Sequence, residues 1–231
     1  MSSSIPLRTP PKPDSERLAD YERLSIEKAV ADNFYVVRKK AQILANADRK
    51  DEAIKALKVF GITLGENNPF SNSVAKSVRQ TEMFNLPLPD LKVERSLGDF
   101  KNLSDLKGKV VILDFRSPLI GRNREGFWQL RLPYDDHRSN GLEVLTVSTF
   151  HGQLASVEEE LAKIEATRTQ IGLKWPLAYI PRSEFETFAS IIRPNLVILD
   201  RKGNVRFMQD DGPVQGSAKL AKLVMELLKE N

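Results

Sequence analysis

Two short apolar runs, separated by a stretch with helical spacing, constrain the fold of this chain most strongly. The runs are Val-Val-Ile-Leu at 110–113 and Leu-Glu-Val-Leu-Thr-Val at 142–147. Continuous apolar runs of this length predict strands that are buried on both faces, as in a parallel sheet. Between them, Phe127, Leu130 and Tyr134 lie three or four residues apart and predict a helix. Strand, helix and strand in this order form a βαβ unit with two parallel strands.

The same kind of pattern continues to the end of the chain. A charged helix is predicted around residues 157–164. Two strands at 196–199 and 205–208 are joined by a turn in which Gly203 suits a positive φ angle. The apolar spacing at 220–227 predicts a closing helix. We therefore predict an α/β fold, in which a mixed sheet is flanked by helices on both faces.

The residues before this unit differ in composition. Residues 1–13 are rich in serine and proline and predict an extended, disordered tail. Residues 14–85 predict a small all-helical segment. Pro87 and Pro89 mark its boundary with a domain at 86–231, because paired prolines cannot continue a helix.

Three helices are predicted within the helical segment. The first carries an apolar stripe from Ile26 to Leu44. The second is predicted to begin at the N-cap Asp48 and to stop at Gly65. For the third, Asn-Pro at 68–69 supplies a cap and a first helical residue.

The stretch at 41–57 resembles a helix–turn–helix of the tetratricopeptide type. No second copy follows at the spacing of about 34 residues that such repeats require. We therefore interpret the helical segment as an extension that packs on the following domain or presents a surface to a partner.

The chain contains no cysteine. This excludes disulfides, thiolate nucleophiles, CxxC redox pairs and cysteine-ligated metal centres. The formal net charge of +4 permits acidic partners but does not require nucleic acid, whose binders concentrate charge more strongly. No apolar run is long enough to predict a membrane span. The N-terminus does not resemble a secretory signal, which predicts either a protein that stays inside the cell or a mature form without its leader.

Four stretches within residues 86–231 occur in an order known from one group of proteins. They are Leu-Pro-Asp at 88–90 with Leu-Lys-Gly-Lys-Val-Val-Ile-Leu-Asp-Phe at 106–115, Gly-Leu-Glu-Val-Leu-Thr-Val-Ser at 141–148, Trp-Pro at 175–176, and Arg-Pro-Asn-Leu-Val-Ile-Leu-Asp-Arg-Lys-Gly-Asn-Val at 193–205. Together they resemble the thioredoxin-like redoxins, which include TlpA-type thiol–disulfide oxidoreductases and relatives of alkyl hydroperoxide reductase. The resemblance implies a thioredoxin-like mixed sheet.

The chain departs from this family at its active site. In active members a Cys-x-x-Cys motif opens the helix after the first core strand, and a low-pKa thiolate attacks the substrate disulfide. Here Ile120 and Asn123 occupy the two cysteine positions. Neither side chain forms a thiolate, so the activity of the family is not carried over to this chain.

The resemblance also implies that Pro194 matches the family's cis-proline, which faces the active-site loop. Arg193 would then lie beside the loop that carries Arg116, Arg122 and Arg124. Guanidinium groups gathered at a helix N-terminus favour anions, so one hypothesis is a site for an acidic peptide or a small anion. The alternative is that these are scattered surface arginines of an arginine-rich chain.

Other candidate sites have weaker sequence support. His137 and His151 are the only histidines, and neither has a carboxylate at metal-ligand spacing, so both are interpreted as surface or loop residues. Ser148 and Ser190 have no neighbouring base or Gly-x-Ser-x-Gly context. No phosphate loop or dinucleotide motif occurs. We expect no metal and no cofactor.

These observations favour a non-catalytic thioredoxin-like module for binding or assembly. The groove around the cis-proline of such folds holds extended peptides by backbone pairing, and that use does not need sulfur. One alternative is an enzyme or a binder of small anions that uses the same cleft with non-thiol chemistry. A second is a member of a redox family that has lost thiol activity, and a third is nucleic-acid binding through the basic surface.

Overall fold

The computed structural model describes residues 13–24, 33–65, 68–120, 124–152, 154–191, 196–209 and 217–230. Its centre is a six-stranded sheet with the order β1-β4-β3-β2-β5-β6. The strands are β1 (Arg95–Leu97), β2 (Val110–Asp114), β3 (Leu142–Ser148), β4 (Leu177–Tyr179), β5 (Leu196–Leu199) and β6 (Val205–Gln209). The helices are α1 (Asp14–Leu24), α3 (Phe34–Ala45), α4 (Lys50–Leu64), α5 (Ser71–Glu82), α6 (Arg124–His137), α7 (Val157–Ile171), α8 (Arg182–Ile191) and α9 (Ser217–Lys229).

The strand directions confirm the predicted mixed sheet. Strands β2, β3 and β4 are parallel, and Val110 on β2 pairs with Leu142 on β3. Strand β5 runs antiparallel to both β2 and β6, with Ile112 opposite Ile198. The predicted βαβ unit and the predicted hairpin are therefore both present, side by side in one sheet.

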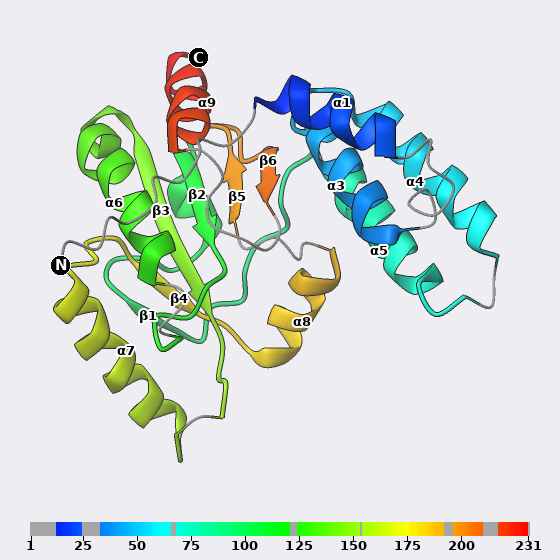
Figure 1. The fold of residues 1–231 in the computed structure, drawn as a ribbon. Helices are drawn as coiled ribbons and strands as arrows, with labels where there is room; N and C mark the ends of the chain where they lie inside the picture. Colours follow the sequence, from blue (N-terminus) through cyan, green and yellow to red (C-terminus); the bar gives the residue numbers. More distant parts are fainter. Residues whose placement is uncertain are drawn as a thin grey trace, which may run out of the picture.

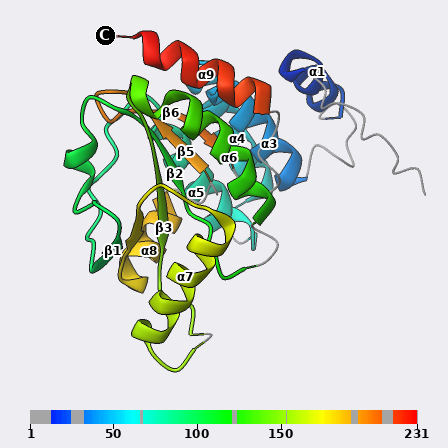
Figure 2. The same ribbon diagram turned by 90° about the vertical axis from the view of Figure 1, so that its left-hand side faces the viewer.

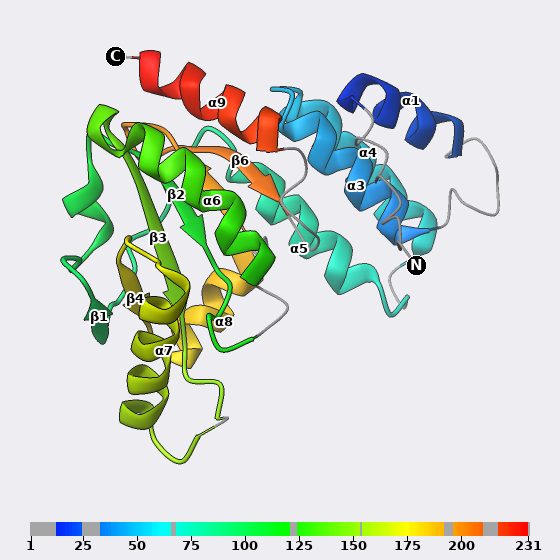
Figure 3. The same cartoon turned by 60° about the vertical axis from the view of Figure 1, so that its left-hand side comes forward.

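Helices cover both faces of the sheet because its central strands are apolar on both sides. Val110 and Ile112 face a core that α6 and α9 close with Phe127 and Leu220, whereas Val111 faces the core shared with the helical segment. Figures 1 and 3 show α6, α7 and α9 on one side of the sheet and α3, α4, α5 and α8 on the other. Figure 2 is seen from the first side, with α6 and α7 in front of the strands.

The helical segment packs against the sheet at the edge strand β6. Asn46, at the end of α3, donates its amide to the Met208 carbonyl (3.0 Å) and accepts the Met208 N–H (3.1 Å). The chain after α5 continues along the same edge, where Asn85 donates its N–H to the Val205 carbonyl at 2.8 Å. These bonds occupy backbone groups that would otherwise lie open on an edge strand.

Two predicted helix starts are wrong, the first by one residue and the second by two. Asp48 lies in the left-handed region at φ 60°, and α4 begins at Lys50 after Arg49, which makes no side-chain cap. The third helix begins at Ser71 rather than at Pro69, and the Asn68 side chain instead accepts the N–H of Phe70 in the preceding turn.

The stripe expected for the first helix belongs to α3 from Phe34 onward. Asn33 caps this helix through its side chain. Val37, Ala41 and Leu44 are buried against the rest of the core, as predicted. Ile26 and Val30 lie outside the described residues.

No described helix combines the length and the low polarity that a membrane crossing requires.

Candidate functional site

The candidate site lies where the parallel strands β2, β3 and β4 end. Asp114, Ser148 and Tyr179 are the last residues of these strands, and Ser148 pairs with Tyr179 in the sheet register. In open α/β sheets, ligands bind outside the carboxyl ends of the strands. The loop that follows β2 carries Ile120, which occupies the place of a redox cysteine according to the resemblance.

The base of this loop is fixed by a buried ion pair. Asp114 is fully buried, and Arg116 is 7% exposed. Arg116 donates two hydrogen bonds to the Asp114 carboxylate, from Nε to Oδ1 at 2.6 Å and from Nη2 to Oδ2 at 2.9 Å. Burial raises the pKa of the Asp114 carboxyl group above its ordinary value, and the positive charge of Arg116 opposes this rise. The pair lets two charges stay within the core.

Helix α6 provides the space that the Arg116 side chain occupies. A Cβ atom on Gly126 would lie 1.3 Å from Arg116 Nη1, so any other residue at this position of the first helical turn would displace the guanidinium group. The guanidinium carbon lies 5.4 Å from the centre of the Phe127 ring, which adds a cation–π contact. The Nε and Nη2 groups of Arg116 therefore bond to Asp114 and are not available to a ligand.

The structure places only part of the expected arginine group. Arg116 points into the core and pairs with Asp114, so its charge is balanced internally. Ile120 is half-buried, and its N–H donates to the Ser117 carbonyl in a turn. Arg124 begins α6, but its side chain is not described. The other expected residues, Arg122, Asn123, Arg193 and Pro194, lie outside the described residues.

A second group of polar atoms is buried beside the loop, at the ends of β3 and β4. The Ser148, Thr149 and Tyr179 hydroxyls and the His151 Nε2 atom have no hydrogen-bond partner in the part of the chain that the structure describes. Glu160 on α7 is fully buried, and its two carboxylate oxygens accept the backbone N–H of His151 at 3.1 and 3.3 Å. A buried polar atom without a partner is costly, so a water molecule or another polar group in contact with these atoms would stabilise them.

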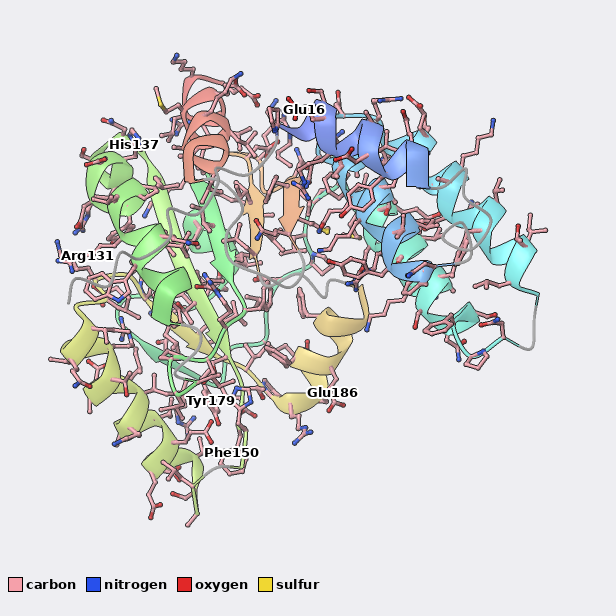
Figure 4. The ribbon with its side chains drawn as sticks, viewed as in Figure 1. Glu16, Arg131, His137, Phe150, Tyr179 and Glu186 are labelled. Carbon is pink, nitrogen blue, oxygen red and sulfur yellow. The ribbon has the colours of Figure 1, made fainter. Side chains whose placement is uncertain are left out.

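The environment keeps the Tyr179 phenol protonated. Burial raises the pKa of Tyr179 well above its ordinary value, and the negative charge of Glu160 raises it further. Tyr179 therefore remains a hydrogen-bond donor across the physiological pH range. Figure 4 shows Tyr179 and Phe150 near the same end of the sheet, between α7 and α8. Leu119 of the loop packs on the apolar cluster that contains Tyr179, which joins the two parts of the site.

Sequence reasoning missed this second group. Ser148 and His151 lack a base or a carboxylate nearby in the sequence, whereas the fold brings Glu160 to the His151 backbone. Within the described residues, no group of three or more histidine or carboxylate side chains is placed to hold a metal ion. The chemistry present is that of hydroxyl donors, one imidazole and one buried carboxylate.

Comparisons with known proteins found matches among solved structures. No family model matches the chain, and no curated protein sequence does either. A thiol:disulfide interchange protein from Bacteroides sp. is 18% identical, covers 64% of this chain and 91% of its own, and has a TM-score of 0.49. A thiol-disulfide isomerase from Corynebacterium glutamicum is 22% identical, covers 63% and 97%, and has a TM-score of 0.46. A thioredoxin family protein from Chlorobium tepidum is 18% identical, covers 62% and 95%, and has a TM-score of 0.47.

The sheet itself shows the arrangement that the sequence resemblance implied. The parallel unit β2-α6-β3 lies next to the antiparallel hairpin β5-β6, and α9 closes the same face as α6. The chain has a thioredoxin-like fold. Since the sequence has no cysteine, this thioredoxin-like domain lacks the sulfur pair of the thiol–disulfide exchange proteins that it resembles.

Proposed function

We propose that the protein is a non-catalytic thioredoxin-like module that binds an extended or acidic peptide at the loop between β2 and α6. The observation that carries this proposal is the buried Asp114–Arg116 pair at the base of the loop, together with the half-buried Ile120 in the loop. A redox loop must expose a sulfur atom to its substrate. Here the base of the loop is held by an internal ion pair and its reactive position is aliphatic, which suits a rigid binding surface.

The outer face of α6 supplies apolar contacts next to this loop. Trp128 is 53% exposed and Leu132 is 71% exposed, and they lie four residues apart on one face of the helix. The Arg131 guanidinium lies 5.5 Å from the centre of the Trp128 ring. Tryptophan and arginine are the residue types that most often anchor protein partners. A surface of this kind favours a protein or peptide ligand that carries negative charge.

We propose that the remaining arginines of the sequence prediction belong to the same surface. Arg122, Arg124 and Arg193 would face the peptide, while Arg116 holds the loop from below. Charge-assisted hydrogen bonds from guanidinium groups to carboxylates are stronger than those between neutral groups. Binding should therefore weaken with salt and should prefer glutamate-rich over lysine-rich peptides.

Trp128 provides a direct test, because Trp175 is buried and Trp128 is exposed. A glutamate-rich extended peptide is titrated while tryptophan fluorescence is followed, with a lysine-rich peptide of equal length as the comparison. The double variant Arg122→Glu/Arg193→Glu should weaken binding about tenfold or more. The control variant Lys55→Glu/Lys58→Glu carries the same charge change on the exposed side of α4 and should bind normally. Equal binding of both peptides, or equal weakening in both variants, would refute the proposal.

A second function is supported by the buried polar group at the ends of β3 and β4. Glu160 and the Tyr179 hydroxyl would bind a small polar molecule in a site without thiol chemistry. A thermal-shift screen of small polar compounds tests this alternative. A compound that stabilises the wild-type protein but not Glu160→Gln would support it, and stabilisation that persists in this variant would argue against it.

A further inference from the structure

A separate cavity of about 270 Å³ lies at the opposite end of β2 from the loop. Its floor is apolar and consists of the buried side chains of Leu88, Leu106, Val111 and Leu199. Val111 lies near the first residue of β2, whereas Asp114 ends that strand beneath the loop. We call this cavity the basal pocket, and its occupation does not depend on the function proposed for the loop.

Hydrogen bonds hold the walls of the basal pocket in place. On one side, the Asp200 Oδ1 atom accepts the N–H groups of Lys202 and Asn204, both at 2.9 Å, and fixes the turn between β5 and β6. On the other side, Asp90 Oδ1 accepts the N–H of Leu103 at 2.8 Å. The Leu88 N–H donates to the Gly203 carbonyl at 3.1 Å and joins the two sides. The pocket is therefore formed before any ligand binds, which lowers the cost of binding.

The two carboxylates at the rim are held by groups that the structure describes, whereas the two lysine ammonium groups are not. Two carboxylates line the pocket, but Asp200 is paired with Arg206 at 3.5 Å and Asp90 accepts backbone N–H groups. Lys107 and Lys202 also line it, and both are exposed. Neither lysine ammonium group has an ion pair or hydrogen bond to a described residue. An apolar floor beneath two unpaired cations matches a molecule with an apolar body and an anionic head.

We propose that the basal pocket binds a medium-chain carboxylate, with its hydrocarbon chain on the leucine floor and its carboxylate between Lys107 and Lys202. The volume of about 270 Å³ equals that of about nine water molecules in the liquid. A cavity of this volume can hold a chain of about eight carbon atoms whose head group lies at the rim. For a ligand of this size we expect a dissociation constant on the order of 0.1–1 mM.

Octanoate is the probe, and octylamine is the matched control with the same chain length and the opposite charge. Each is titrated into the ¹⁵N-labelled full chain while amide chemical shifts are followed. Octanoate should shift the resonances of Gly203 and Ser104 and leave that of Ile120 at the loop unchanged. Octylamine should bind at least about tenfold more weakly, since it places a cation beside the two lysines.

Two variants test the chemistry of the basal pocket. The double variant Lys107→Glu/Lys202→Glu changes exposed side chains only and should weaken octanoate binding about tenfold or more. Ser104→Trp places a bulky ring at the exposed rim and should also reduce binding. The proposal is overturned if octylamine binds as well as octanoate, if the lysine variant retains its affinity, or if the shifts occur at the loop. Peptide binding by Arg122→Glu/Arg193→Glu is measured separately, so each proposal can fail without the other.

Discussion

Removing the positive member of the buried pair tests the architecture of the loop most directly. Arg116→Met deletes two hydrogen bonds and leaves the Asp114 carboxylate fully buried without a charged partner. Breaking a buried ion pair in this way costs about 3–5 kcal/mol of unfolding free energy. That is a large share of the stability of a typical domain, about 5–15 kcal/mol.

The loss should depend on pH in a defined direction. Burial already raises the pKa of Asp114, and Arg116→Met removes the positive charge and the side-chain hydrogen bonds that oppose this rise, while the backbone N–H of residue 116 remains. A carboxyl group with a raised native pKa binds its proton more tightly in the folded protein than in the unfolded chain. The destabilisation is therefore complete above the native pKa. It diminishes as the pH falls through that value and disappears below about 3.9, the ordinary value for Asp.

Urea unfolding near neutral pH and at about pH 5 measures both quantities. The double variant Asp114→Asn/Arg116→Met removes the stranded charge and should recover at least about half of the loss. Arg182→Met removes an arginine from an exposed pair with Glu186 and should cost at most about 1 kcal/mol. If Arg116→Met lowers the unfolding free energy by less than about 1 kcal/mol, or by the same amount at both pH values, then Asp114 and Arg116 do not form the buried ion pair described above.

Three further substitutions test other parts of the structure. Asn46→Ala leaves the N–H and carbonyl of the buried Met208 without their partner, so urea unfolding should show a loss of about 2–4 kcal/mol. A change below about 1 kcal/mol would mean that the helical segment is not anchored there. Gly126→Ala should displace the Arg116 side chain and lower the melting temperature nearly as much as Arg116→Met, and a melting temperature equal to that of the wild type would contradict it. Tyr179→Phe removes a hydroxyl that has no hydrogen-bond partner among the described residues, so stability should change by less than about 1 kcal/mol, and a larger loss would contradict this.

The sequence predicted the parts of the fold that rest on long apolar patterns. The runs at 110–113 and 142–147 became β2 and β3, and the turn around Gly203 joins β5 and β6. The short strand β4 was missed because its three residues are too few to show the periodicity of a strand or a helix. Helix starts were less accurate, since Asp48 resembles an N-cap in sequence but adopts a left-handed turn.

The candidate site was only partly predictable. The aliphatic Ile120 at a cysteine position follows from the sequence resemblance alone. The role of Arg116 does not, because an arginine beside a loop predicts an exposed charge unless a buried partner is known. Asp114 two residues earlier was the available signal, as residues two apart in extended chain lie on the same side. The approach of Glu160 to the strand ends had no comparable signal.

The sequence by itself determined which chemistry is impossible, because a chain without cysteine has no thiol in any conformation. It also determined the α/β class, since the apolar periods of strands and helices are local properties. Only the tertiary structure decided which polar groups lose contact with water and which partners they meet. Asn46 and Met208 are 162 positions apart, yet they bond to each other. Burial and pairing depend on distances in space, and local patterns in the sequence do not contain those distances.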